Sequence, residues 1–360
     1  ILPSLQGTAN FTGMMKPAGI FIAVFLLLLF FFHSLKAQTG HYDAYMDSVK
    51  ADLLIQAQQV LFNDGFETAD SLCRAFITRY PSDPAGYFFK AAVLLAEMSD
   101  REENLYPEQF HRLLDTAANL AEKMTNHPDR RYRAWMYLFS GHVRAYRSLW
   151  EARFGSMLAA VNAAFKARSE YEKGLENDST LVDLYLGLGS YHYWKSARAG
   201  IFRWLGILKN QKDQGLEELY RAYQGSIISR ESARSAMLWV WLDLKEYDSV
   251  VALAHEALLK YPGGKSFRWP LARAYFEKKD YSKALQTYQD LRNGIASNPG
   301  NYYNLIECDY YLNQCYDRMQ MNEEAHQAAR HMKKYYDKIP GDVRQRQRDN
   351  IAYLKRVART

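Results

Sequence analysis

Apolar side chains recur at every third or fourth position along much of the chain, and this spacing predicts amphipathic helices. The clearest example, over residues 231–262, is repeated over residues 265–296 at an offset of 34 positions. In both copies an apolar run is followed by a polar turn, "KEYD" in the first and "KKDY" in the second, and then by another apolar run. Two helices joined by a short turn are therefore the expected building unit.

Positions inside the unit are specialised by size. The second copy has a large, a small and an aromatic residue on its first helix, then a small and an aromatic residue on its second: Leu271, Ala272, Tyr275, Ala284 and Tyr288. On each helix these positions share one face, and the small residues let the two helices approach closely. A 34-residue helix–turn–helix unit of this kind is typical of tetratricopeptide repeats (TPRs). We expect an all-α fold, a right-handed α-solenoid of TPR-type repeats.

Weaker copies occupy most of the remaining chain. Residues 50–83 and 306–339 carry the pattern, and the stretches "DPAGYFFKAAVLLAEMSD" and "LVDLYLGLGSYHYW" each match its first helix. Further helices are expected near 107–127, 130–152 and 154–175, although these match the pattern poorly. About six helix pairs are expected, which is enough for a stable stack.

The N-terminal stretch has the layout of an export signal. Met14 or Met15 is the expected start, Lys16 supplies a positive charge, and residues 18–32 form an apolar run that is short for a membrane span. Cleavage is expected before Gln38, which leaves a periplasmic or envelope-associated protein; an uncleaved membrane anchor is the alternative. The expected organisation is a signal region over 1–37, N-terminal TPR-like repeats over 38–180, and C-terminal repeats over 181–360 with a hydrophobic connector at 201–208.

Composition adds little about partners. Hydrophobic residues make up 48% of the chain, which allows a sizeable core, and the formal net charge of +6 falls to +4 once Lys16 and Lys36 are removed. Most basic residues are spread out, so no nucleic-acid partner is expected. The three cysteines, Cys73, Cys308 and Cys315, are expected to be buried thiols rather than disulfide partners.

The stretch "GLGSYHYWKSARAGIFRWLG" and the "KDQGLEELYRAYQGS" that follows it together resemble the tetratricopeptide repeat protein 39 family and its bacterial relatives. That family has a "GLG-x-Y-x-Y" helix, an apolar connector and a "GL-x-x-L-x-x-A" helix. The matching residues here are Gly187, Gly189, Tyr191, Tyr193, Leu205, Gly206, Gly215, Leu216, Leu219 and Ala222. Asn210 and Gln211 depart from the Gly-Asp of the family pattern. The resemblance covers about residues 180–290 and implies a fold without catalytic residues.

Motifs of known enzyme classes are incomplete. "GGKS", at Gly263–Ser266, resembles the end of a phosphate loop, but Leu259 stands where that loop needs a glycine, and no strand is expected before it. A turn between repeats is expected there instead. "HEALL", from His255, lacks the second histidine of a zinc-protease helix. We expect no catalytic residues, no metal site and no cofactor.

Binding is the function that remains. In this kind of repeat, four places on each first helix line a concave groove, and in the last three units they hold Ser232, Ser235, Trp239, Leu242, Ser266, Trp269, Arg273, Phe276, Glu307, Tyr310, Gln314 and Asp317. The predicted binding set is Trp239, Trp269, Arg273, Phe276, Tyr310 and Gln314. Exposed aromatic residues with an arginine are typical of binding hot spots. The alternative is that a neighbouring helix or the connector covers them.

The expected function is therefore an exported interaction scaffold that binds a peptide or partner protein in this groove. A helical carrier or accessory protein, which would hold an apolar small molecule under the 201–208 connector, is the alternative. An enzyme with scattered catalytic residues is the third interpretation. An open groove would favour the first function, whereas a deep closed pocket with convergent polar groups would favour the other two.

Overall fold

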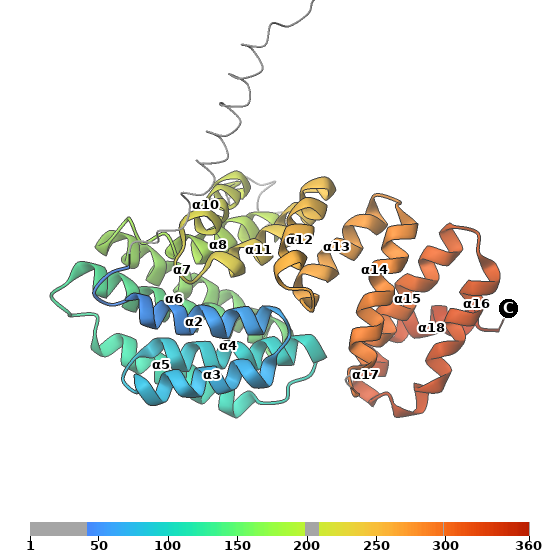
Figure 1. Cartoon of the computed structure of the whole chain (residues 1–360), viewed down its shortest axis with the longest axis horizontal. Coiled ribbons are helices and arrows are strands. Elements are labelled where there is room, and N and C mark those ends of the chain that lie inside the picture. Colours follow the sequence, from blue (N-terminus) through green and yellow to red (C-terminus); the bar gives the residue numbers. More distant parts are fainter. Residues whose placement is uncertain (1–41, 199–208, 298, 360) are drawn as a thin grey trace, which may run out of the picture. The chain divides into compact units, whose positions relative to one another are not determined.

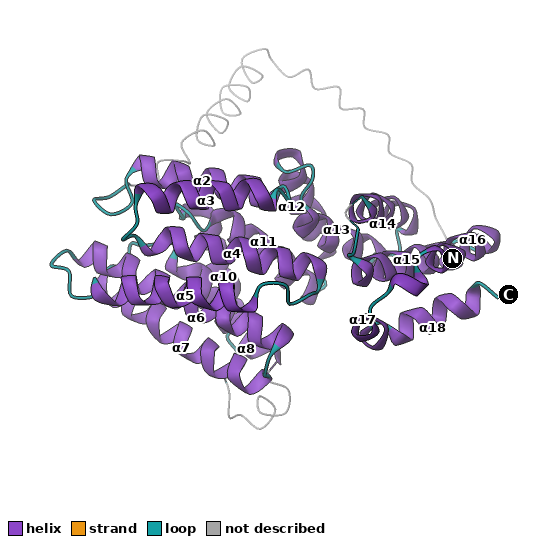
Figure 2. Ribbon diagram, turned by 90° about the horizontal axis from the view of Figure 1, so that it is seen from below, coloured by secondary structure: helices purple, strands orange, loops and turns teal. Residues whose placement is uncertain are grey.

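The structure, a computed structural model, describes residues 42–198, 209–297 and 299–359, and residues from Tyr42 onward form one compact unit. Every regular element in these ranges is helical (Figures 1 and 2). The helices are α2 (Ser48–Phe62), α3 (Phe66–Arg79), α4 (Pro84–Arg101), α5 (Pro107–Lys123), α6 (Arg130–Phe154), α7 (Met157–Asn177), α8 (Leu184–Arg198), α10 (Lys212–Gly225), α11 (Arg230–Asp243), α12 (Tyr247–Lys260), α13 (Lys265–Glu277), α14 (Tyr281–Ala296), α15 (Tyr302–Arg318), α16 (Asn322–His331), η1 (Met332–Lys334), η2 (Tyr336–Lys338), α17 (Gly341–Arg346) and α18 (Arg348–Val357).

Consecutive helices pack against one another in sequence order, which makes the fold an all-α solenoid. Within the described ranges the successive pairs are α2–α3, α4–α5, α6–α7, α8–α10, α11–α12, α13–α14 and α15–α16. The expected period is present, because α12 begins at Tyr247 and α14 at Tyr281. The described ranges thus contain seven pairs where about six were expected, and α5, α6 and α7 form pairs although their sequence matches the repeat poorly.

Small residues stand where the two helices of a pair meet. Ala57 and Ala69 lie between α2 and α3, and Ala272 and Ala284 lie between α13 and α14; all four are buried. Buried aromatic and thiol side chains of the core, including that of Tyr288, lie on the same helices as these alanines. Burial of these apolar side chains is the main source of stability for such a stack.

The glycines of "GLG" in α8 are explained by two close helix contacts. A side chain at Gly187 would overlap the ring of Tyr171 from α7, and Gly141 of α6 faces the same ring from another side. A Cβ at Gly189 would lie only 2.7 Å from the carbonyl oxygen of Gly215 in α10. Both positions need glycine because a ring or a backbone occupies the space that a Cβ would take, so the "GLG" stretch is a packing seam.

Helix α2 also contacts residues far along the chain. The backbone N–H of Gly263 donates a 2.8 Å hydrogen bond to Asn63 Oδ1, and the backbone N–H of Lys265 donates a 3.0 Å bond to Asp64 Oδ2. The Lys265 ammonium forms ion pairs with Asp100 at 2.9 Å and with Asp64 at 3.6 Å. The α2–α3 turn and the end of α4 thus meet the α12–α13 turn, and we call this set of contacts the closure interface.

Further contacts extend the closure interface to α15 and α17. The side-chain amides of Asn301 and Asn304 each donate a 2.6 Å hydrogen bond to the backbone oxygen of Asp100. Arg346 donates a 2.8 Å bond to the backbone oxygen of Glu102 and also forms an ion pair with its carboxylate. The first helix pairs are therefore joined to the last ones by polar contacts as well as through the helices between them.

Aromatic packing completes the closure interface. The ring of Phe62 lies 5.4 Å from that of Phe267 and 6.0 Å from that of Tyr261. A Cβ at Gly264 would lie 2.6 Å from the backbone oxygen of Phe62. "GGKS" is thus a turn between helix pairs, as expected, and its glycines permit the close approach of α2.

Helix α18 closes the C-terminal end by packing on α15 and α16. Ile351 and Leu354 are buried on its inner face, which explains why this basic helix has an apolar stripe. Cys73, Cys308 and Cys315 are buried free thiols, and this confirms their predicted role as small apolar residues.

Candidate functional site

The concave positions differ between the two ends of the solenoid. In α4 the residues at the four groove places, Ala85, Phe88, Ala92 and Leu95, are all buried. In α11, α13 and α15 the corresponding twelve residues are all half-buried or exposed. All four groove positions thus stay at least partly accessible on α11, α13 and α15, the helices for which the sequence predicts a groove.

Trp239 is the most accessible aromatic residue of the predicted binding set. Its side chain is 41% exposed. The other predicted residues, Trp269, Arg273, Phe276, Tyr310 and Gln314, are half-buried. When a partner covers an exposed tryptophan, apolar surface is removed from water, which favours binding. Trp239 is therefore the strongest candidate anchor of the predicted set.

Two of the half-buried residues pack directly on one neighbour, Tyr311 of α15, and a third reaches it through Tyr288. Arg273 lies over the Tyr311 ring at 4.8 Å and donates a hydrogen bond to its hydroxyl. The Phe276 ring contacts the Tyr311 ring at 5.2 Å, and Trp269 reaches it indirectly through Tyr288. These side chains join successive helix pairs, and each stays half-buried at a predicted groove position, so they have both a packing and a surface role.

Tyr310 lies at the far end of the groove, where α18 begins to cover it. Its ring contacts that of Tyr353 at 5.2 Å, and Asn350 of α18 donates a 3.1 Å hydrogen bond to the neighbouring Glu307 carboxylate. Gln314 is half-buried one turn further along α15. Helix α18 thus partly covers Tyr310 and Glu307, whereas Asp317, at the last groove position of α15, stays exposed, as Trp239 does in α11.

A buried polar pair between α8 and α10 was not predicted from the sequence. His192 Nδ1 lies 2.7 Å from Glu218 Oε2, and Gln214 donates a 2.9 Å hydrogen bond to the other carboxylate oxygen. Ser196 accepts a 2.8 Å bond from the backbone N–H of Gln211. His192 follows Gly189 by three positions and Glu218 follows Gly215 by three, so polar residues at matching places beside two contact glycines could have indicated such a pair. Because each partner satisfies the other, the pair fixes α10 on α8.

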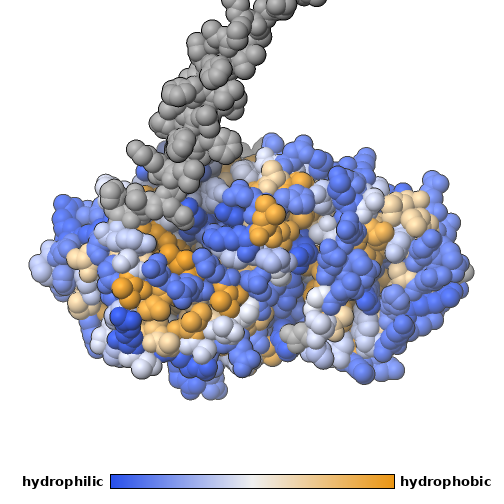
Figure 3. Space-filling view, in the orientation of Figure 1, coloured by the Kyte–Doolittle hydropathy of each residue, from blue (hydrophilic) through white to orange (hydrophobic). Residues whose placement is uncertain are grey.

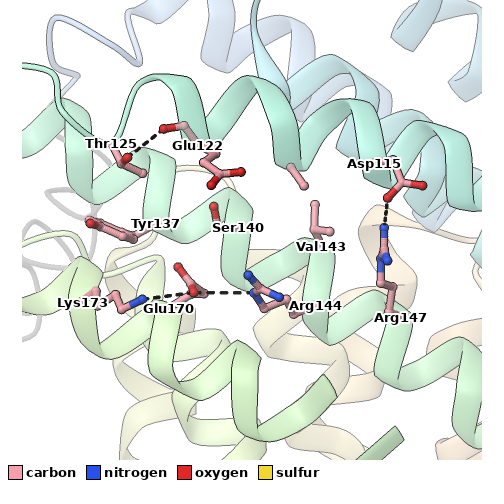
Figure 4. Close-up of a pocket in the computed structure, with 11 residues that line it drawn as sticks. Asp115, Glu122, Thr125, Tyr137, Ser140, Val143, Arg144, Arg147, Glu170 and Lys173 are labelled. Carbon is pink, nitrogen blue, oxygen red and sulfur yellow. Dashed lines mark hydrogen bonds and ion pairs between the residues drawn. The ribbon is translucent and has the colours of Figure 1, made fainter. Parts of the chain in front are cut away.

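A polar cleft of about 450 Å³ lies over α6, between α5 and α7 (Figure 4). Its charged lining residues are Asp115, Glu122, Glu170, Arg144, Arg147 and Lys173. Arg147 pairs with Asp115, and Glu170 pairs with Lys173 at 3.3 Å and with Arg144 at 3.6 Å. The three acids balance the three bases, so the cleft has no net charge to attract an ionic ligand.

Exposed large apolar side chains concentrate at the α6–α7 hairpin. Leu149 of α6 and Met157, Leu158, Val161 and Phe165 of α7 are all at least 46% exposed. Figure 3 shows a second apolar region over the first helices near α2, whereas the surface over α14 to α16 is mainly hydrophilic. The hairpin is therefore a rival contact surface that experiments on the groove must control for.

The hydrophobic connector at 201–208 lies outside the described residues, and so does the apolar run at 18–32. No helix within the described ranges is long and apolar enough to cross a membrane. In the same ranges no group of three or more histidine, cysteine or acidic side chains could hold a metal ion.

Comparison with known proteins finds distant similarities among solved structures. No family model matches the chain, and no curated protein matches it. Among solved structures, the chain is similar to the crystal structure of a thermophilic TPR protein from Thermus thermophilus, with 16% sequence identity and a TM-score of 0.39. That match covers 62% of this chain and 98% of the other. It carries no functional argument, and the resemblance to the tetratricopeptide repeat protein 39 family stays a prediction.

Proposed function

We propose that the protein is an interaction scaffold without catalysis of its own, which binds a peptide segment of a partner protein on the groove of α11, α13 and α15. The observation that supports this most strongly is the exposure of Trp239, at 41%, on a helix face whose counterparts in α4 are buried. When a partner covers a tryptophan that is accessible at such a place, the burial of its apolar surface lowers the free energy of the complex.

The groove chemistry suits an extended or helical segment with one large apolar residue. Trp239 provides the apolar contact, and Trp269 and Phe276 add half-buried aromatic surface beside it. Ser235, also half-buried, offers a hydroxyl group for a backbone hydrogen bond. Arg273 is already paired with Tyr311 and Glu277, so a purely acidic segment is not the expected ligand.

A random-peptide display library tests this function without knowledge of the natural partner. Peptides enriched on the protein should share a large apolar residue and should lose affinity for the Trp239→Ala variant. Enrichment of peptides whose binding is insensitive to Trp239 would contradict the proposed site. Failure to enrich any peptide would contradict the proposed function itself.

We also propose that the protein is exported, on the basis of the charged and apolar layout of residues 16–37. The native protein should then begin near Gln38. N-terminal sequencing of protein isolated from its own cells distinguishes this from an anchored form, which would be recovered in the membrane pellet with Met14 or Met15 retained.

A further inference from the structure

Two carboxylates share one ammonium group at the centre of the closure interface. Lys265 begins α13, and its Nζ lies 2.9 Å from Asp100 Oδ2 and 3.6 Å from Asp64 Oδ2. The side chains of these three residues are 13%, 11% and 20% exposed. Within the described residues, the charged groups that face Asp64 are Lys265 and Asp100. The cluster therefore has one negative charge in excess when both acids are ionised.

The cluster joins parts of the chain that are distant in sequence. Helix pairs in a solenoid are stabilised mainly by their neighbours along the chain. The closure interface is an additional contact, between α2–α4 on one side and α12–α15 on the other. In an open form these contacts would be lost while the packing between neighbouring helix pairs, which holds a solenoid together, is kept. On opening, Asp64 and Asp100 would become hydrated.

We propose that formation of the closure interface takes up a proton at Asp64, so that acidification favours the closed form. Protonation leaves Asp100 and Lys265 as a neutral one-to-one pair. The Asp64 carboxyl can still accept the 3.0 Å hydrogen bond from the Lys265 backbone through its unprotonated oxygen.

Burial and charge both favour protonation of Asp64 in the closed form. Burial is the largest cause that raises the pKa of Asp64 from its ordinary value to about 6; Lys265 opposes it, and the neighbouring Asp100 charge adds a smaller increase. Burial likewise raises the pKa of Glu102, which lies at the α17 side of the closure interface beside Arg153 and Arg346. Both carboxyl groups therefore bind protons more readily in the closed form than in water.

The number of protons bound by each form decides how pH shifts the equilibrium between the open and closed forms. The closed form binds more protons than the open form between pH 6 and the ordinary aspartate pKa of 3.8, so lowering the pH through this window stabilises the closed form. Between pH 7.5 and pH 5, the equilibrium constant for closing should rise by about tenfold.

The test is a carboxyl-carbon NMR titration of protein labelled with ¹³C-aspartate. The Asp64→Asn variant identifies the Asp64 signal by its loss, and asparagine suits the positive φ of 62° at this position. Gly263→Val is the opening variant, because the nearest atoms to a Cβ there all belong to Asn63, across the closure interface. Gly294→Val is the matched control, since nothing lies within 4 Å of a Cβ at that position.

Asp64 should titrate near pH 6 in the unmodified protein and in Gly294→Val, and near the ordinary aspartate value in Gly263→Val. An ordinary midpoint in the unmodified protein would overturn the proposal. So would a midpoint near 6 that persists in the opening variant. If valine at 263 prevents folding, Gly263→Ala, a smaller wedge at the same contact, replaces it in the comparison.

Discussion

The backbone N–H of Gly263 donates a 2.8 Å hydrogen bond to the side chain of Asn63, which lies 200 positions earlier in the chain. A solenoid does not require such a contact, because its repeats interact along the chain. The contact explains why two glycines interrupt the boundary between α12 and α13. One of them leaves room for Asn63, and the other leaves room for the backbone of Phe62.

A disulfide across this contact should form readily. The nearest atoms to a Cβ at Gly263 all belong to Asn63, whose Cγ, the atom that a cysteine sulfur would replace, lies 3.4 Å away, so cysteines at the two positions would face each other. Oxidation of the Asn63→Cys/Gly263→Cys double variant should give an intramolecular bond, seen as faster migration on a non-reducing gel. The native thiols are buried and should not compete. Each single variant is the control, and a double variant that yields only intermolecular dimers would show that the closure interface does not form in solution.

Gly189 should not tolerate a side chain. A Cβ there would meet the backbone of Gly215 and Leu219, at 2.7 and 2.8 Å, so α8 and α10 would have to separate. Overpacking of this kind typically costs about 1–3 kcal/mol, and we expect Gly189→Leu to lower the free energy of unfolding by that amount. Gly294→Leu, at an open helical position, is the control for the effect of leucine itself. Equal urea midpoints for the two variants would refute the close contact.

Acid should destabilise the α4–α7 region through His142. Burial lowers the pKa of this histidine to about 3, and its Nδ1 is hydrogen-bonded to the Tyr171 hydroxyl at 2.9 Å. The unfolded chain takes up a proton below about pH 6.5 and the folded chain does not, so stability falls as the pH drops through that value. We expect a loss of about 2 kcal/mol between pH 7.5 and pH 5.

Replacing His142 with glutamine removes the titrating group and keeps a hydrogen-bonding side chain. The variant should therefore lose this part of the pH dependence of urea unfolding. An unchanged pH dependence would show that His142 is not the group responsible. The effect is opposite in sign to the proton uptake proposed for the closure interface, so overall stability and closure should respond to acid in opposite directions.

Much of the fold could be predicted because the repeat is a local pattern. The 34-residue offset, the small residues at Ala272 and Ala284 and the turn at "GGKS" each depend on neighbours a few tens of residues away. Gly189 was also predictable, since a glycine inside a helix needs a packing reason. The pairing of α5, α6 and α7 was less clear because their residues depart from the repeat pattern.

The closure interface could not be predicted in the same way. Asn63, Asp64 and Lys265 are polar residues in turns, and in sequence they are indistinguishable from solvated ones. Their pairing depends on how the small rotation between successive helix pairs accumulates, which no single repeat specifies. The sequence left open whether Trp269 is exposed or covered, and the structure places it half-buried against Tyr288.

The most direct test of the proposed function compares two exposed apolar residues on different surfaces. Trp239 lies in the groove and is 41% exposed, and Leu158 lies on the α6–α7 hairpin and is 80% exposed. Neither truncation should change stability by more than about 0.5 kcal/mol, because surface substitutions rarely do. For a display-selected peptide, measured by isothermal titration calorimetry, Trp239→Ala should weaken binding at least about tenfold, the range of a hot-spot residue, and Leu158→Ala should leave it unchanged. Binding that survives Trp239→Ala and is lost with Leu158→Ala would contradict the account and assign the contact surface to the hairpin.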